Sequence, residues 1–178
     1  MQSFFKTDRI MLRAPEMTDL EVMYSMENDP ELWDVTNFSV PYSRFILKTY
    51  IEQASCDMFA DRQLRLMIVR HADAEVLGTI DITDFAPRHA RGEVGISIRK
   101  EFRRQGYARE ALQLLCDYAF RFLHLAQLNA HVFADNAASL QLFESCGFVR
   151  CGLLKQWWMT ADGFQDVVVM QRLNENRL

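Results

Sequence analysis

The chain has 178 residues, a length typical of one domain with a sizeable core. Its composition, 49% hydrophobic and 25% charged, is that of an ordinary soluble globular protein. The formal net charge of −4 argues against a general nucleic-acid binder, which would carry a basic patch. No apolar run is long enough to cross a membrane, and the N-terminus lacks the apolar region of a signal peptide.

The four cysteines form neither a Cys-x-x-Cys pair nor a zinc-ligand spacing. We therefore expect no metal site. Unpaired cysteines fit a reducing, cytoplasmic setting best.

The first half of the chain predicts a strand, two helices and a hairpin. Residues 9–12 are apolar enough for a strand, and Thr18 or Asp19 can cap a helix that runs to about Glu27. An irregular segment follows, and Pro41 opens a second helix to about residue 54. The segments 65–70 and 76–84 are typical of a hairpin turned at Asp73-Ala74.

The second half predicts four strands and two helices. Residues 93–99 alternate strictly between apolar and polar, and apolar residues then recur at helical spacing from 108 to 123. A strand at 127–134 precedes a short helix that Gly147 stops. Two last strands, 149–159 and 164–173, are joined by Asp162-Gly163. The predicted order is βααβββαβαββ, a mixed α/β fold.

The turn between the strand at 93–99 and the long helix predicts a phosphate site. A strand that turns tightly into a helix leaves N–H groups unpaired at the positive end of the helix dipole. Gly106 lets the backbone approach a ligand closely, and Arg103 and Arg104 add positive charge. On these residues alone, a solvated loop is an equally good interpretation.

The segments on both sides of this turn favour the phosphate site over a solvated loop, because together they resemble a known family. The order strand, Arg103-x-x-Gly106-x-Ala108, long helix, strand, Asn136-x-x-Ser139, short helix, Gly147-Phe148 resembles the GNAT superfamily of acyl-CoA-dependent N-acyltransferases. The resemblance implies one domain over residues 1–178, with a central, twisted, mostly antiparallel sheet flanked by four helices. It also implies a splay between the fourth and fifth strands.

The resemblance implies acetyl-CoA as co-substrate, with the pantetheine arm in the splay. The main chain of Ile96, Ser97 and Ile98 would pair with the amides of that arm, although these residues could equally form an ordinary core strand. The other residues implied to bind the cofactor are Arg103, Arg104, Gln105, Gly106, Tyr107, Ala108, Arg109, Asn136 and Ser139.

Two residues are the catalytic candidates. Glu93 opens the strand beside the splay, where related enzymes carry a glutamate, and is the expected base that takes the proton of the amine, directly or through water. Its alternative role is a solvated charge. Ser139 would donate a hydrogen bond to the leaving sulfur, or else pack within its helix. Many members place a tyrosine where this chain has Phe143, so that proton donor is missing.

The acceptor-binding candidates are Trp33, Asp81, Asp84 and Glu93. Asp81 and Asp84 are second-line bases, acceptor-binding carboxylates or turn residues. By resemblance Trp33, together with Phe38, Trp157 and Trp158, would wall the acceptor site, although aromatic side chains are as common in cores. His89 and His131 are interpreted as structural, because a lone histidine in a turn or strand more often is.

The function implied is an acetyl-CoA-dependent N-acetyltransferase that acts on a primary amine by direct attack. The acceptor is a protein N-terminus or a small amine. Ser139, the absent tyrosine and the segment from Asp162 to Val167 slightly favour the branch that acetylates ribosomal-protein N-termini over the spermidine/diamine branch. An alternative of another class is a catalytically idle acyl-CoA sensor. A homodimer is expected because dimers are common in the family.

Overall fold

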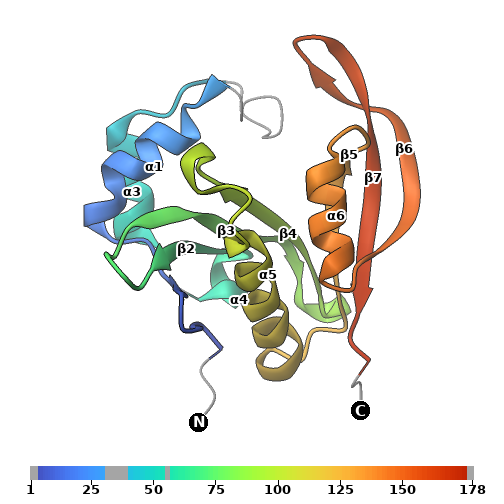
Figure 1. The fold of residues 1–178 in the computed structure, drawn as a ribbon, viewed down its shortest axis with the longest axis horizontal. Coiled ribbons are helices and arrows are strands. Elements are labelled where there is room, and N and C mark those ends of the chain that lie inside the picture. The colour runs from blue at the N-terminus through green and yellow to red at the C-terminus, as the bar shows by residue number, and fades with distance from the viewer. Residues whose placement is uncertain (1–3, 31–39, 55–56, 176–178) are drawn as a thin grey trace.

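The computed structural model describes residues 4–30, 40–54 and 57–175. Their seven strands form one sheet in the order β1-β2-β3-β4-β5-β7-β6 (Figure 1). The strands are β1 Ile10–Arg13, β2 Leu64–Arg70, β3 Val76–Ala86, β4 Arg91–Ile98, β5 Gln127–Phe133, β6 Val149–Thr160 and β7 Gly163–Leu173. The helices are α1 Leu20–Glu27, α3 Arg44–Gln53, α4 Met58–Asp61, α5 Tyr107–Asp117 and α6 Ala137–Ser145.

The predicted order of strands and α-helices is confirmed, with one added α-helix and shifts in several boundaries. The four-residue helix α4, capped by the side chain of Asp57, is absent from the prediction because it is too short to show a period. Helix α3 begins at Arg44 and not at Pro41, because the hydroxyl of Ser43 accepts the N–H of Ile46 and caps the helix there. The long helix ends as an α-helix at Asp117 and adds one wider turn, Tyr118–Phe122.

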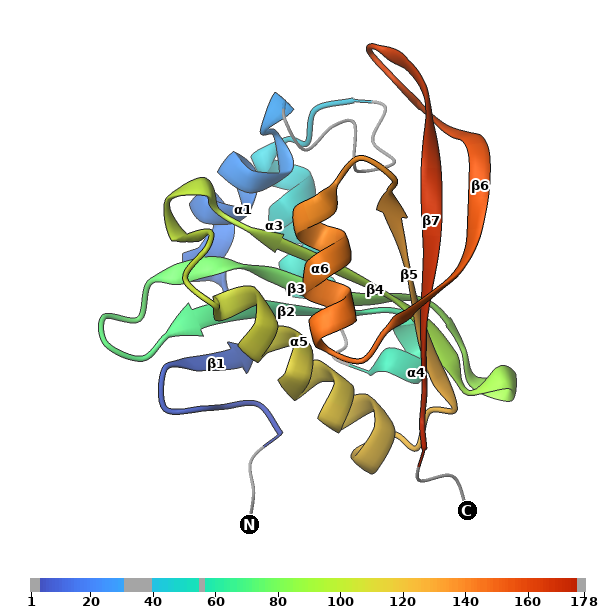
Figure 2. The ribbon, with the colours of Figure 1, turned by 45° about the vertical axis from the view of Figure 1, so that its right-hand side comes forward.

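The helices cover both faces of the sheet. Helices α5 and α6 lie in front of the central strands in Figure 2, and their apolar side chains join the larger core cluster. Helices α1 and α3 cover the other face, where Met23 and Leu47 pack on Met67 and Val69 of β2. The strand period of two thus sends alternate β2 side chains into two separate cores.

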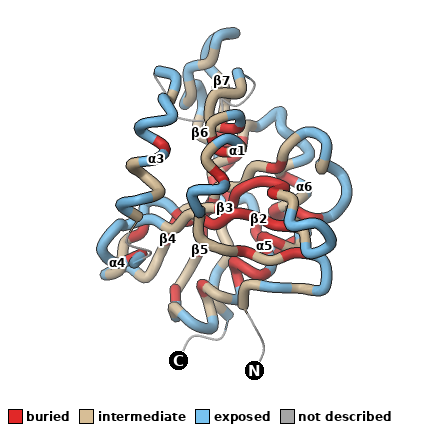
Figure 3. The backbone as a smooth tube through the Cα atoms, turned by 90° about the vertical axis from the view of Figure 1, so that its left-hand side faces the viewer, coloured by how far each residue is buried: buried red, intermediate tan, exposed pale blue. Residues whose placement is uncertain are grey.

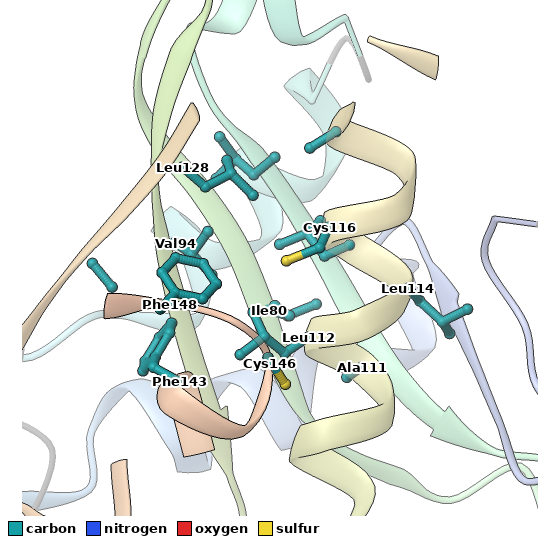
Figure 4. Close-up of a cluster of buried hydrophobic side chains, with 14 of the residues drawn as sticks. Ile80, Val94, Ala111, Leu112, Leu114, Cys116, Leu128, Phe143, Cys146 and Phe148 are labelled. Carbon is teal, nitrogen blue, oxygen red and sulfur yellow. The ribbon is translucent and has the colours of Figure 1, made fainter. Parts of the chain in front are cut away.

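The larger core joins α5, α6 and the middle of the sheet. Figure 4 shows Cys116 of α5 and Cys146 at the end of α6 among Ile80, Val94 and Leu112. Figure 3 shows the same distribution along the backbone, with the buried positions concentrated in the inner strands and the inner side of α5. This core holds the first turn of α5 against the sheet.

The sheet divides between β4 and β5. Their parallel pairing covers only Arg91 with Gln127, Gly92 with Leu128 and Glu93 with Asn129. Beyond Glu93, no strand residue in the described part of the chain pairs with β4 on its β5 side, whereas β3 pairs with the other side as far as Ile98. The expected splay between the fourth and fifth strands is therefore present.

Candidate active site

A cavity of about 850 Å³ opens where β4 and β5 separate. That volume lies in the range usual for small-molecule and cofactor sites. Thirteen of the candidate residues line it: Asp81, Glu93, Ile96, Ser97, Ile98, Arg103, Arg104, Gly106, Tyr107, Ala108, Arg109, Asn136 and Ser139. Residues far apart in sequence are thus brought to one space.

Three candidate residues are not placed there. Gln105 lies in the loop, but its amide nitrogen bonds to the carbonyl of Glu101 and its side chain does not line the cavity. Asp84 is exposed at the far end of β3, where its carboxylate pairs with Arg91 at 2.6 Å. Trp33 lies outside the described residues.

The loop before α5 has the geometry of an anion site. Gly106 caps the helix with φ +86°, and no side chain caps the N–H groups of the first turn. Arg104 also has a positive φ, 61°, a strained conformation that is typical of functional loops. Arg103 donates from Nε to the carbonyl oxygen of Ile98 at 2.8 Å, which fixes the loop to the end of β4.

These features fit the cofactor implied by the resemblance. Past Glu93 the β5-facing edge of β4 offers backbone N–H and C=O groups that a chain of amides can pair with. That edge leads to Ile98 and from there to the uncapped first turn of α5, which suits a pyrophosphate. The residues present therefore fit acetyl-CoA, with its amide arm along β4 and its phosphates at the loop.

At the end of the cavity away from the loop before α5, charged side chains lie on one face of the sheet. Arg65 of β2 donates a two-pronged bond to Asp81 of β3, with Nε–Oδ1 at 2.9 Å and Nη2–Oδ2 at 3.1 Å. Its remaining nitrogen bonds to Glu27 of α1. Burial lowers the pKa of Arg65, but the charges and hydrogen bonds of Asp81 and Glu27 raise it by more, so the guanidinium stays charged.

Glu93 has a specific partner in the cavity. Its Oε1 lies 3.0 Å from Nδ1 of His131 on β5, and both side chains keep partial exposure, 31% and 26%. His131 and Glu93 both line the cavity. The pair connects the two halves of the sheet just beyond the last backbone pairing.

Helix α6 supplies the remaining candidate groups. The side-chain oxygen of Asn136 accepts the N–H of Ser139 at 3.0 Å, so Asn136 caps the helix. Phe143 also lines the cavity and packs edge-on against Phe148, with ring centroids 5.0 Å apart. Among the lining residues of α6, Ser139 carries the hydroxyl.

A family model described as an acetyltransferase (GNAT) domain matches residues 9–149. The chain belongs to this acetyltransferase family. Its sequence is 28% identical to the spermidine N(1)-acetyltransferase of Vibrio cholerae over 170 residues, 96% of each chain. It is 33% identical to the [ribosomal protein bS18]-alanine N-acetyltransferase of Escherichia coli over 75 residues, 42% of this chain and 50% of that one.

Solved structures agree with this assignment. The crystal structure of the Vibrio cholerae spermidine enzyme in complex with CoA and spermine matches with a TM-score of 0.83 at 25% identity, covering 94% of this chain and 97% of that chain. The same enzyme has been solved as a dodecamer. The predicted family, the mixed α/β fold and the activity as an N-acetyltransferase are thereby confirmed.

Sequence reasoning missed Glu27 and Arg65 of this acetyltransferase cavity and interpreted His131 as structural. Glu27 ends a predicted helix and Arg65 begins a predicted strand, and no local sequence pattern indicates that the two side chains meet. His131 could have been found from the strand register, because it shares a β5 face with Asn129, the residue opposite Glu93. Of the aromatic residues expected to wall the acceptor site, Trp158 lines the cavity.

Proposed function

We propose that this acetyltransferase transfers the acetyl group of acetyl-CoA to a primary amine of a small cationic acceptor, with polyamines as the first class to test. The observation that carries the proposal is the charge of the cavity beside β4. At the end of the cavity away from the arginines of the loop before α5, three carboxylates, those of Glu27, Asp81 and Glu93, line it against one guanidinium, that of Arg65. A surplus of negative charge favours a cationic amine.

The similarity to the spermidine enzyme supports the same acceptor class. It extends over nearly the whole chain, whereas the similarity to the ribosomal-protein enzyme covers 42% of it. The proposal therefore reverses the slight preference drawn from Ser139 and the segment from Asp162 to Val167.

The cofactor would be held by two groups of residues. The backbone of Ile96, Ser97 and Ile98 would pair with its amide arm, and the first turn of α5 with Arg103 and Arg104 would hold its phosphates. Acetyl-CoA supplies an acetyl group activated as a thioester. The protein has to deprotonate the ammonium of the acceptor, orient the free amine and stabilise the sulfur that leaves.

Glu93 and Ser139 are assigned to these tasks. Glu93, together with His131, would take the proton of the ammonium beside the acceptor-binding carboxylates. As the C–N bond forms and the C–S bond breaks, the thiolate leaves with the electron pair, and the proton that the attacking nitrogen loses converts it to a thiol. The hydroxyl of Ser139 would donate a hydrogen bond to the leaving sulfur, since Phe143 has no proton to give.

The second candidate acceptor is a peptide N-terminus. The 75-residue similarity to the ribosomal-protein enzyme and the retained Ser139 favour it. A third candidate, an idle acyl-CoA sensor, is supported only by Phe143. The cavity end that carries Trp158, Asp81 and Glu93 would receive either kind of amine.

Mass spectrometry after incubation with acetyl-CoA and a pooled panel distinguishes these candidates. The panel holds spermidine, spermine, putrescine, amino acids and short peptides with free N-termini. We expect a polyamine product of one added acetyl group, which is lost in Asp81→Asn. A peptide product alone would overturn the polyamine assignment. Binding of acetyl-CoA by calorimetry with no product from any acceptor would favour the sensor.

We also propose that the chain self-associates, on the precedent of the dodecameric Vibrio cholerae enzyme. Light scattering of the purified protein tests this directly. A monomer at micromolar concentration would reject it.

A further inference from the structure

The contact between Glu93 and His131 fixes the direction of one hydrogen bond. A carboxylate accepts and cannot donate, so the Nδ1 that lies 3.0 Å from Oε1 of Glu93 must carry the proton. In the neutral imidazole, the lone pair then resides on Nε2. Nε2 of His131 can therefore accept a new proton, whereas the carboxylate of Glu93 already accepts the hydrogen bond from Nδ1.

The strand geometry places this nitrogen beside the acceptor end of the cavity. Glu93 is the last β4 residue paired with β5, and His131 lies two residues past its partner Asn129 on the same face. Asp81 lies opposite Gly95 in the neighbouring pair of strands, so its side chain is on that sheet face too. His131 is thus bordered by Glu93 from β4 and lies in the same cavity as the carboxylates proposed to bind the amine.

We propose that Nε2 of His131 is the base that removes the proton from the acceptor ammonium, and that Glu93 is its positioning residue. In this step one N–H bond of the ammonium breaks, its electron pair stays on nitrogen, and the proton moves to Nε2. The imidazolium, stabilised by the Glu93 carboxylate, returns the proton to water after acetyl transfer. This inference rests on the proposed acetyl transfer and reassigns the base within it.

The surrounding charges affect the two roles differently. The other ionisable side chains that line the cavity are Glu27 of α1, Arg65 of β2, Asp81 of β3, and Arg103, Arg104, Tyr107 and Arg109 at the start of α5. Asp81 and Glu27 are already bound by Arg65, which leaves Glu93 as the carboxylate in direct contact with the ring. Loss of Glu93 should therefore disturb the orientation of the ring without removing the base.

Three variants separate these roles: His131→Gln, Glu93→Gln and, as a matched control, His89→Gln. His89 is exposed and lies outside the cavity. The kcat of acetyl transfer is measured from pH 5 to 9 at saturating acetyl-CoA. The affinity of each variant for acetyl-CoA is measured by calorimetry. The tautomer of the neutral His131 ring is measured by nitrogen-15 NMR in the wild type.

We expect His131→Gln to lower kcat by about 100-fold, the usual contribution of a general base, and to remove the acid limb of the pH profile. Glu93→Gln should keep the acid limb and lower kcat by less than His131→Gln does, and NMR of the wild type should find the proton of the neutral ring on Nδ1. His89→Gln should match the wild type. Acetyl-CoA should bind all three variants as it binds the wild type.

The reverse result overturns the assignment. If Glu93→Gln removes the acid limb while His131→Gln keeps it, Glu93 is the base. If the wild type acetylates nothing, the proposed function fails by itself, and NMR still tests the pair. A neutral ring that carries its proton on Nε2 then rejects Glu93 as the partner that positions His131.

Discussion

At the scale of single residues, α6 presents one hydroxyl to the cavity, that of Ser139. Ser139 lies one turn before Phe143, and both line the space between β4 and β5. The ring of Phe143 is 3% exposed and packs on Phe148, so it serves the core as well as the cavity wall. We therefore expect Ser139 to stabilise the departing sulfur.

Replacing Ser139 with alanine should lower kcat about tenfold, which corresponds to about 1.4 kcal/mol of transition-state stabilisation from one hydrogen bond. The Kd of acetyl-CoA should change little. Ser145→Ala is the matched control, because its hydroxyl bonds to the carbonyl of Leu142 and lies outside the cavity. Steady-state kinetics measure kcat for both variants. Equal kcat values would show that Ser139 has no role in the reaction.

Phe143→Tyr should restore part of the lost rate in the Ser139→Ala background. The added hydroxyl would supply a proton donor from the next turn of the same helix. We expect a several-fold gain in kcat over Ser139→Ala alone, at the scale of one hydrogen bond. No gain, in a protein with an unchanged unfolding midpoint, would mean that the ring edge of Phe143 does not face the sulfur.

At the scale of elements, the start of β1 supports the loop before α5. Arg9 donates from Nη2 to the carbonyl oxygen of Gln105 at 2.8 Å, pairs with Glu110 at 3.3 Å, and stacks over the ring of Tyr107. Hydrogen bonds from Arg70 and Arg9 lower the pKa of that tyrosine. The loop is thus held from outside by a segment about 100 residues earlier in the chain.

Arg9→Ala should weaken acetyl-CoA binding by about three- to tenfold while kcat at saturation stays the same. The loss follows because the loop would have to be ordered on binding, at a cost of about 1 kcal/mol. Arg88→Ala, at an exposed position outside the cavity, controls for the change in net charge. Calorimetry that gave the same Kd for both variants would contradict a role for Arg9.

Element order could be predicted from the sequence, whereas one local irregularity could not. The alternation in β4 and the helical period of α5 are local signals, and both elements form where they predict. In β6 the pairing with β7 shifts between Leu154 and Trp158, where Gln156 has φ +48° and donates its N–H to Asp166. This bulge places Trp158 at the cavity and leaves Trp157 exposed, which strict alternation does not reveal.

At the scale of the whole molecule, one buried ion pair ties the first strand to the first helix. Asp19 is 3% exposed and receives two bonds from Arg13, at 2.6 and 2.9 Å, and one from the N–H of Glu16. Burial raises the pKa of Asp19, but these hydrogen bonds together lower it below its ordinary value of 3.8. Its charge therefore stabilises the folded state above that value, and the contribution is lost as pH falls through the lower folded pKa.

Asp19→Asn should reduce the free energy of unfolding at pH 7 by about 3 kcal/mol, since it leaves the partly buried Arg13 without its counter-charge. The difference in the free energy of unfolding between variant and wild type should stay constant down to pH 3.8 and become smaller below it. Urea unfolding across this range measures this difference. The control is Glu21→Gln, which removes a charge from the exposed ion pair with Arg44. This variant should leave the midpoint of urea unfolding unchanged.

The cavity could be predicted only in part, because its two ends depend on different information. The cofactor end is a contiguous motif, Arg103 to Arg109, and its backbone geometry follows from that short stretch. The acceptor end joins Glu27, Arg65, Asp81 and His131 from four elements, and only the folded sheet brings them together. Strand register, which the sequence does not state, decides those contacts.

The buried thiols of the core have a practical consequence for measuring catalysis. Acetyl transfer releases one free thiol per turnover, and thiol-reactive dyes count such groups. Burial raises the pKa of the Cys116 thiol to about 12 and also raises that of Cys146, so neither should react in the native protein. Of the three cysteines in the described residues, only Cys151 is exposed, and Cys151→Ser should remove its contribution to the dye signal.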